Sequence, residues 1–250
     1  MTKIILKSAQ EIEIMRKSGQ IAASILNKLK DVVKPGITTQ NLNILAEKLI
    51  RDAGSTASFK NFHNYPASIC TSVNEEVVHG IPGDRILQKG DIIGIDLGIL
   101  YQGFHSDTAL TCGVGKISTD AQKLIDVTQK ALEKAILIIK IDAHLGDIGS
   151  TIQSYVEKEG FSVVRSLVGH GVGRELQEDP SVPNYGKKGE GIILKEGMVI
   201  AIEPMINTGK YFVKVLNDSW TVITADKSLS AHFEHTVAVT KNGPIILTKE

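Results

Sequence analysis

Cysteine, net charge and long apolar runs are all scarce in this sequence. Among its 250 residues, Cys70 and Cys112 are the only cysteines, and their spacing fits neither a metal motif nor a redox motif. This excludes a zinc finger and suits free thiols in a reducing cytosol. Lys plus Arg and Asp plus Glu each total 28, so no net field attracts the chain to nucleic acid or to an anionic membrane.

The apolar stretches are too short to direct secretion or to span a membrane. Near the N-terminus, Ile4 to Leu6 is the longest apolar run before charge returns, so the hydrophobic region of a signal peptide is missing. The most apolar segments, 92–100 and 197–206, are each interrupted by an acid and fall far short of the roughly 20 residues of a membrane helix. We therefore expect a cytoplasmic protein with no membrane partner.

The first half of the chain predicts two helices followed by a β-hairpin. Ser8 and Glu11 form a capping box that opens an amphipathic helix, which Pro35-Gly36 ends. A second helix runs from about Thr38 to Gly54. Segments 92–100 and 104–114 then flank the turn residues Tyr101, Gln102 and Gly103, which predicts a hairpin.

The second half predicts the same order of elements. The expected helices are 118–140 and 147–159, and the expected strands are 161–169, 197–206, 221–224 and 234–240. Landmarks repeat at a steady offset, because Gly36 and Gly146 are 110 residues apart and Asp96 and Glu203 are 107 apart. We interpret this as two related halves within one domain, although any series of helix, helix and hairpin produces some coincidence of this kind.

Asp96 and Asp107 are the first residues that indicate chemistry. Asp96 interrupts an apolar strand, and the hairpin places it near cross-strand opposition with Asp107, at ~8 Å or less. Two buried carboxylates persist side by side if they share a proton or if a cation lies between them. No Lys or Arg neighbours them in the sequence, so a metal ion is the simpler explanation. The alternative is a pair of solvated acids on an exposed face of the sheet.

Three further residues extend this interpretation. Glu203 and Glu234 each place a carboxylate in a strand that we expect to be buried. His170 lies in GHGVG, where the glycines are expected to let the backbone bend tightly around a ligand. The segment does not match a nucleotide-binding fingerprint. Carboxylates with a single imidazole favour Mn, Fe, Co or Zn over calcium.

The other histidines have simpler explanations. His79 precedes a turn rich in Gly and Pro, where it either caps the turn or lies beside the metal site as a neutral hydrogen-bonding group. His63 allows the same two interpretations. No catalytic role is assigned to the remaining four, which are His105, His144, His232 and His235.

In this order and in these contexts, the five candidate ligands resemble those of the methionine aminopeptidases and their wider pita-bread relatives. The resemblance covers nearly the whole chain and is carried by ASICTSVNEEVVHGIPGD, GDIIGIDLGILYQGFHSDTA, LVGHGVGRELQEDPSVPNYG, GMVIAIEPMI and SWTVITADKSLSAHFEHTVAV. With no N-terminal extension expected before Ser8, the chain is similar to the short bacterial type I enzymes. The resemblance implies one catalytic α/β (α+β) domain, residues 1–250, with a pita-bread fold of two pseudo-symmetric helix-helix-hairpin halves around a curved antiparallel sheet.

The resemblance also implies a role for each ligand. Asp107 and Glu234 would bridge two divalent ions, Asp96 would complete one site, and His170 with Glu203 would complete the other. Glu203 would also transfer a proton, and His79 would hydrogen-bond the substrate amide. The implied reaction removes the initiator methionine from nascent polypeptides with a small second residue, and the ribosome is a further candidate partner.

A methionine-sized pocket follows from the same resemblance. Its expected residues, which are otherwise ordinary candidates for core packing, are Phe62, His63, Tyr65, Cys70 and Trp220, and apolar and aromatic walls of this kind suit a thioether. One position departs from the family, because Gln177, next to Leu176, stands where a second catalytic histidine is usual. Glutamine can donate a hydrogen bond but cannot carry a proton, so we expect slower turnover or a changed specificity.

Three other functions remain as alternatives. A prolidase-like relative with another N-terminal specificity would use the same ligands. A weakly active or purely binding homologue would follow if Gln177 impairs the site. A mononuclear iron oxygenase that uses His79, His170 and Asp96 would leave the other buried carboxylates unexplained.

Overall fold

The computed structural model describes residues 4–250, so the first three residues of the N-terminal segment considered above for a signal peptide lie outside it. Two helices come first, α1 (Ala9–Val32) and α2 (Thr39–Asp52), and a second pair, α3 (Thr119–Leu137) and α4 (Leu145–Lys158), follows in mid-chain. None of the helices in the described part of the chain is long and apolar enough to cross a membrane.

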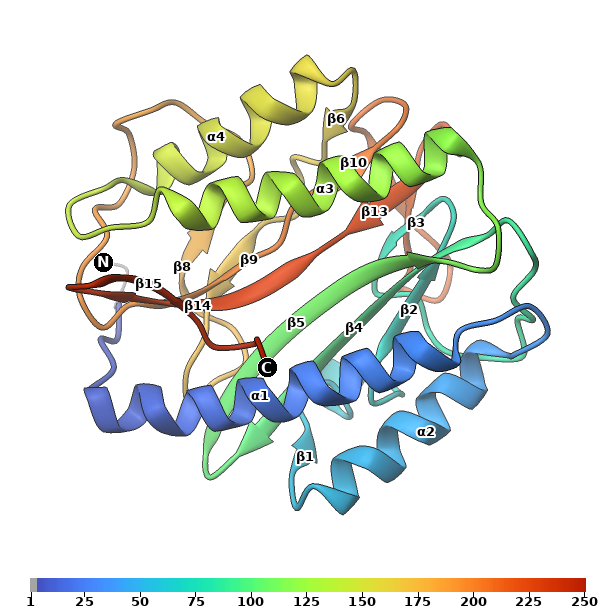
Figure 1. The fold of residues 1–250 in the computed structure, drawn as a ribbon, viewed down its shortest axis with the longest axis horizontal. Helices are drawn as coiled ribbons and strands as arrows, with labels where there is room; N and C mark the ends of the chain where they lie inside the picture. The colour runs from blue at the N-terminus through green and yellow to red at the C-terminus, as the bar shows by residue number, and fades with distance from the viewer. Residues whose placement is uncertain (1–3) are drawn as a thin grey trace.

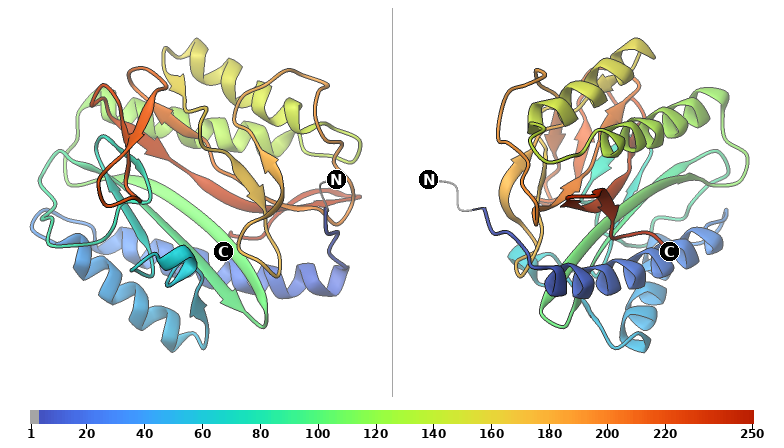
Figure 2. Two further views of the ribbon diagram at one scale, coloured as in Figure 1. Left: turned by 180° about the vertical axis from the view of Figure 1, so that it is seen from behind. Right: turned by 60° about the vertical axis from the view of Figure 1, so that its left-hand side comes forward.

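The main sheet is antiparallel, and α1 and α3 lie side by side on one face of it (Figure 1). Its strands, in spatial order, are β1 (Thr56–Ala57), β4 (Ile92–Tyr101), β5 (Phe104–Gly113), β14 (Glu234–Thr240), β9 (Val199–Ile202), β7 (Gly169–Gly171) and β8 (Glu178–Val182), with β2 (Cys70–Val73) paired to β4 and β15 (Gly243–Ile246) paired to β14. Seen from behind and from the side, the sheet is curled, with α1 and α3 packed across it (Figure 2).

Two small sheets complete the fold. One joins β13 (Ser230–His232), β10 (Met205–Asn207) and β6 (Ser162–Val163); the other joins β11 (Val213–Val215), β12 (Val222–Thr224) and β3 (Glu76–Val78). A short 3-10 helix, η1, covers Phe62–Asn64.

The helices begin at or near the residues that the sequence predicted. Ser8 caps α1 through the Glu11 backbone N–H, and the Glu11 carboxylate accepts from the Ser8 N–H at 2.9 Å, which completes the capping box. α2 begins at Thr39, after its N-cap Thr38. The predicted 118–140 helix is shorter at its end, because α3 stops at Leu137.

The strand predictions need three corrections. Tyr101 is paired with Phe104, so the turn consists of Gln102 and Gly103, both at positive φ. Most of segment 161–169 is not strand, because β6 ends at Val163 and β7 begins at Gly169. The predicted 197–206 strand is divided into β9 and β10, and Glu203 lies in the gap rather than in a strand.

Each half has its own hydrophobic core, and the two cores meet at the sheet. One core joins α1 and α2 to β4, and the other joins α3 and α4 to β9 and β14. α1 is fixed to the first hairpin by Ser18, whose Oγ donates to the Ile99 carbonyl at 2.9 Å. The halves are therefore packed around one shared sheet, as the repeated landmarks predicted.

Candidate metal centre and adjoining pocket

The five predicted metal ligands converge on one cavity of about 360 Å³. They come from β4, β5, β7, the gap after β9, and the start of β14, and they are Asp96, Asp107, His170, Glu203 and Glu234. The His170 Nε2 atom lies 3.7 Å from Glu203 Oε1 and 4.0 Å from Asp107 Oδ2. We call this space the site cavity.

The hairpin register places the two aspartates on the same face. Asp96 is paired with Ala109, and Asp107 is paired with Gly98, so the two acids are diagonal neighbours, near the cross-strand opposition that we expected. Burial raises the pKa of Asp107 to about 7. Burial, followed by the charges of Asp107 and Glu203, raises the pKa of Asp96 well above its usual value.

The two glutamates complete the acidic cluster from the second half. Glu203 lies between β9 and β10, and Asn184 Nδ2 donates to its backbone carbonyl at 3.0 Å. Glu234 is 2% exposed at the start of β14. For both residues, burial first and the Asp107 charge second raise the pKa well above the ordinary value of a glutamate.

His170 is oriented as a metal ligand. Its Nδ1 lies 2.9 Å from the Gly171 carbonyl oxygen, which can only accept, so Nδ1 carries the proton and Nε2 keeps its lone pair. Burial lowers the pKa of His170, which favours the neutral ring. The imidazole therefore presents Nε2 to the carboxylates.

The glycines around His170 serve a different purpose from the one predicted. Gly169 and Gly171 have no positive φ, so they do not produce a tight bend. A Cβ on Gly169 would lie 2.2 Å from the Ala201 carbonyl oxygen, and one on Gly171 would lie 2.3 Å from that of Asp179. The glycines are thus required for the close approach of neighbouring strands.

The cluster fits divalent cations. Asp96 Oδ1 and Glu234 Oε1 are buried without a hydrogen-bond partner, although buried polar atoms are normally paired. Among residues 4–250, no Lys or Arg lines the site cavity, and ligand atoms of Asp107, His170 and Glu234 all lie within 4.8 Å of one another. Buried carboxylates without a protein cation are the donor set that Mn, Fe, Co or Zn ions would satisfy.

Threonines fix the ligand-bearing strands to one another. Thr236 Oγ1 donates to the Asp107 carbonyl at 2.7 Å and accepts from the Asp107 N–H at 2.9 Å. Thr108 Oγ1 donates to the Glu234 carbonyl at 2.9 Å. These bonds join β5 of the first half to β14 of the second, so they set the spacing between Asp107 and Glu234.

His232 also belongs to this region, although the sequence analysis gave it no role. It is 4% exposed, and its Nε2 lies 3.9 Å from Glu203 Oε2 without a hydrogen-bond partner. Burial lowers its pKa to about 3. Its position two residues before Glu234 was the available signal, but residue 233 separates two strands, so simple alternation could not show which way His232 points.

The predicted pocket residues form the walls beside the ligands. The site cavity is lined by all of them: Phe62, His63, Tyr65, Cys70, His79, Gln177 and Trp220. Tyr65 and Trp220 meet edge to face at 5.0 Å, and the His79 ring lies 6.2 Å from Trp220. Leu176, which was expected beside the substrate with Gln177, adds further apolar surface, as do Phe59 and Met205, which were not predicted as pocket residues.

His79 and Gln177 differ in exposure to solvent. His79 is half-buried, and its backbone φ is 60°. Burial, with a smaller contribution from His170, lowers the pKa of His79, so its ring is neutral. Gln177 is exposed and lies immediately before β8. His63 is also exposed, at the rim.

Comparison with known proteins agrees with this arrangement. Residues 13–241 match metallopeptidase family M24. The chain is 55% identical over 245 residues to a methionine aminopeptidase of Clostridium perfringens, covering 98% of each chain. It is 51% identical over 246 residues to methionine aminopeptidase 1 of Bacillus subtilis, covering 98% of this chain and 99% of that one.

Solved structures show the same relationship. A methionine aminopeptidase from Thermotoga maritima matches with a TM-score of 0.98 and 45% identity, over 99% of this chain and 100% of that chain. A prolidase from Pyrococcus horikoshii matches with a TM-score of 0.78 and 26% identity, over 98% of this chain but 63% of its own. The fold is therefore the pita-bread fold.

This chain belongs to metallopeptidase family M24, a family of metal-dependent hydrolases, and within it to the bacterial-type methionine aminopeptidases.

Proposed function

We propose that this protein removes the N-terminal methionine from nascent proteins and from peptides with a small second residue. One observation carries the proposal: four carboxylates and a histidine converge at one end of a cavity that is lined by aromatic and apolar side chains. Such walls suit the flexible, polarisable thioether of methionine.

Two divalent ions of Co, Mn, Fe or Zn would be held by the five ligands. Asp107 and Glu234 would be shared, Asp96 would complete one position, and His170 with Glu203 would complete the other. The bound ions would polarise the scissile carbonyl and make water a better nucleophile. Four carboxylates would nearly balance two divalent charges.

The side chains around the ions would orient the peptide and move protons. Glu203 would accept a proton from the attacking water and deliver it to the leaving amine. His79 would hydrogen-bond the substrate amide as the tetrahedral intermediate forms. Gln177 would donate an amide N–H at the mouth of the cavity, where it is exposed to solvent.

The wider setting is part of the proposal. Residues 1–250 would act as one catalytic domain in the cytoplasm, where Cys70 and Cys112 remain as free thiols. The partner is the N-terminus of a nascent polypeptide, and the ribosome is the candidate site at which the two meet.

Hydrolysis of a peptide panel tests the function. We expect release of methionine from Met-Ala and Met-Gly peptides, much less from a Met-Lys peptide, and none from an Ala-Pro peptide. A chelator should abolish the release, and added Mn²⁺ or Co²⁺ should restore it. Full activity in excess chelator, in protein with no detectable metal, would disprove the metal mechanism.

A prolidase-like activity is the second candidate, because the solved prolidase aligns with 98% of this chain, a region that includes the ligand-bearing sheet. Preferential cleavage of the Ala-Pro peptide would favour it. No cleavage of any peptide by fully metal-loaded protein would instead favour a binding homologue impaired at Gln177.

A further inference from the structure

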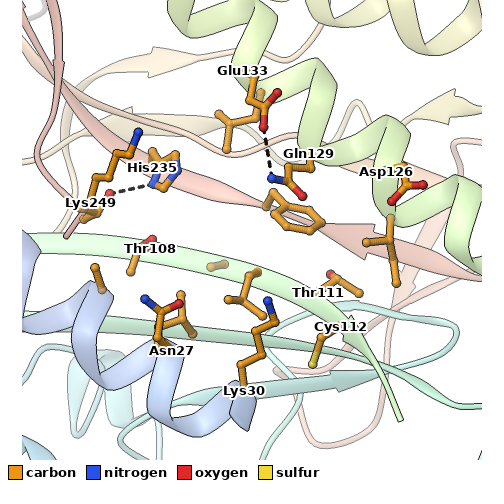
Figure 3. A pocket seen from close by; sticks show the side chains of 18 of the residues that line it. Asn27, Lys30, Thr108, Thr111, Cys112, Asp126, Gln129, Glu133, His235 and Lys249 are labelled. Atoms are coloured by element: carbon orange, nitrogen blue, oxygen red, sulfur yellow. Dashed lines mark hydrogen bonds between the residues drawn. The ribbon is translucent and has the colours of Figure 1, made fainter. Parts of the chain in front are cut away.

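The first helix and the segment before it place their charged groups in two different settings. Along α1, Asn27 and Lys30 border a cavity of about 510 Å³ between α1 and α3, and both side chains are exposed to solvent (Figure 3). Just before α1, by contrast, Lys7 is 6% exposed, and its Nζ lies 2.5 Å from Glu178 Oε2. In every other ion pair of a Lys or Arg within residues 4–250, that cationic side chain is at least 40% exposed. We call Lys7 and Glu178 the buried pair.

The surroundings of the buried pair are fitted closely to it. The Lys7 N–H donates to the Gly197 carbonyl at 2.8 Å, which fixes the backbone of the N-terminal segment. Glu178 Oε1 accepts from the Glu175 N–H at 3.3 Å, so both oxygens of the carboxylate have a partner. A Cβ on Gly173 would lie 2.3 Å from Glu178 Oε1 and 2.5 Å from Lys7 Cε. The absence of a side chain at residue 173 is therefore what leaves room for the pair.

The buried pair lies at the end of a turn that forms part of the site cavity. This turn, residues 172–177, connects β7, which carries the proposed ligand His170, to β8, which begins at Glu178. Leu176 and Gln177 both line the site cavity. Leu176 is 3% exposed and packs in the apolar wall of the pocket. Gln177 is exposed, and its side chain makes no hydrogen bond to another residue of the described range 4–250. The direction of Gln177 is therefore set through the backbone.

The buried pair can set this direction because Gln177 is joined directly to Glu178. Anchoring the Glu178 side chain fixes the end of the turn, and with it the backbone from which Gln177 projects. Stability alone does not account for such a pair, because the cost of removing two charges from water offsets most of their attraction. A fixed geometry for the turn is the contribution that remains.

We propose that Lys7 and Glu178 are positioning residues for the removal of methionine, an inference that rests on the proposed function. The buried pair holds the turn so that Leu176 stays in the pocket wall and Gln177 directs its amide toward the substrate. Neither Lys7 nor Glu178 lines the site cavity, so both act through the turn and not by touching the substrate.

A second ion pair on the same turn supplies the matched control. Arg174 donates to Glu11 Oε1 of α1 at 3.1 Å, but the Arg174 side chain is 65% exposed. Exposed pairs of this kind contribute little. Arg174→Gln removes this pair and should leave kcat and KM for a Met-Ala peptide unchanged.

A variant that removes both buried charges tests the proposal. Lys7→Met with Glu178→Gln nearly keeps the volume of both side chains and leaves no buried charge without a partner, so we expect a wild-type urea midpoint. In metal-saturated protein, kcat/KM for a Met-Ala peptide should fall roughly 10-fold, because small displacements of orienting groups slow a reaction. If this variant does not fold, Glu178→Asp provides the same measurement, since it keeps both charges but shortens the link to the turn.

Coupling to Gln177 is the decisive readout. In the wild-type background, Gln177→Ala should lower kcat/KM roughly 10-fold, as expected for one lost hydrogen bond to the substrate. In the background without the buried pair, the same change should cost less than about 2-fold, because the amide is already displaced. Equal losses in both backgrounds, or no loss in either, would overturn the proposal, because a purely stabilising pair leaves the two effects independent. Wild-type protein that releases no methionine from any peptide would instead refute the proposed function, and this inference with it.

Discussion

The hairpin of the first half is continuous, whereas its counterpart in the second half is interrupted. β4 and β5 pair without a break from Ile92–Gly113 to Tyr101–Phe104. In the second half, β9 pairs with β14 up to Ile202–His235, and the pairing resumes between β10 and β13 at Met205–His232. The register is unchanged across the gap, because both partners advance by three residues.

The two halves therefore position their acidic side chains in different ways. In the continuous half, the register alone places Asp96 and Asp107 on one face, so short acids suffice. In the interrupted half, Glu203 lies outside the ladder and reaches the same cluster with a longer side chain. The chain between β10 and β13 also carries β11, β12 and Trp220, which forms a wall of the pocket.

Removal of the central acid of the continuous half should have the largest effect. Asp107→Asn keeps the volume but removes the charge that both metal positions would share. Loss of a partner outside the ligand shell typically costs 10–100-fold in metal affinity, so loss of this ligand should cost more than ~100-fold. Calorimetric titration with Mn²⁺ measures it, with Asp84→Asn at an exposed position as the control. Wild-type metal content in Asp107→Asn would contradict the shared role.

The matching change in the interrupted half should affect turnover more than metal binding. Glu203→Gln removes the proposed proton carrier, and we expect kcat to fall ~10²–10⁴-fold. Kinetics on a Met-Ala peptide at saturating Mn²⁺ measure this loss independently of metal affinity. If turnover matched the wild type at equal metal occupancy, Glu203 would not be the proton carrier.

The connection between the halves should break when Thr236 is changed to valine. The variant removes both hydrogen bonds to Asp107 and leaves a buried backbone N–H and carbonyl without partners, at a cost of about 1–3 kcal/mol in unfolding free energy. Urea unfolding measures the loss. Thr240→Val is the control, because that hydroxyl bonds to Gly243 within the β14–β15 hairpin and should not alter metal affinity. Equal metal affinity in Thr236→Val and wild type would show that the hydroxyl does not set the ligand spacing.

The smallest expected effect is a gain. Gln177→His introduces the residue type that the resemblance to the family implies at this position, and we expect kcat on a Met-Ala peptide to rise ~10-fold, or about 1.4 kcal/mol of barrier. The gain is modest because the glutamine amide already donates one hydrogen bond. Metal affinity should not change. Unchanged or lower turnover at equal metal loading would mean that the pocket has adapted to glutamine.

Local features of the structure were predictable because they depend on neighbouring residues. The capping box at Ser8 and Glu11 and the turn at Gln102 and Gly103 are encoded by contacts within a few positions. That Asp96 and Asp107 lie close together could be predicted from the length of the hairpin. The exact diagonal register did not, because it depends on which residue of the turn begins the second strand.

Features that join distant segments were harder to predict. The residues alone already indicated that His170, Glu203 and Glu234 belong to a metal site with the two aspartates, and the resemblance to a family supplied the role of each ligand. His232 was missed because β13 ends at this residue, and alternation within β14 could not be extended across the break at residue 233. The glycines beside His170 were noticed but misinterpreted, because the backbone that approaches them comes from β8 and β9.

By itself, the sequence determined the helices, the first hairpin and the presence of acids within apolar segments, because periodicity, caps and turn residues act over short distances. Only the tertiary structure decided which acids share a cavity. This outcome depends on how two separately encoded halves pack across one sheet. A shift of a single residue in that packing would send every ligand on a strand to the opposite face.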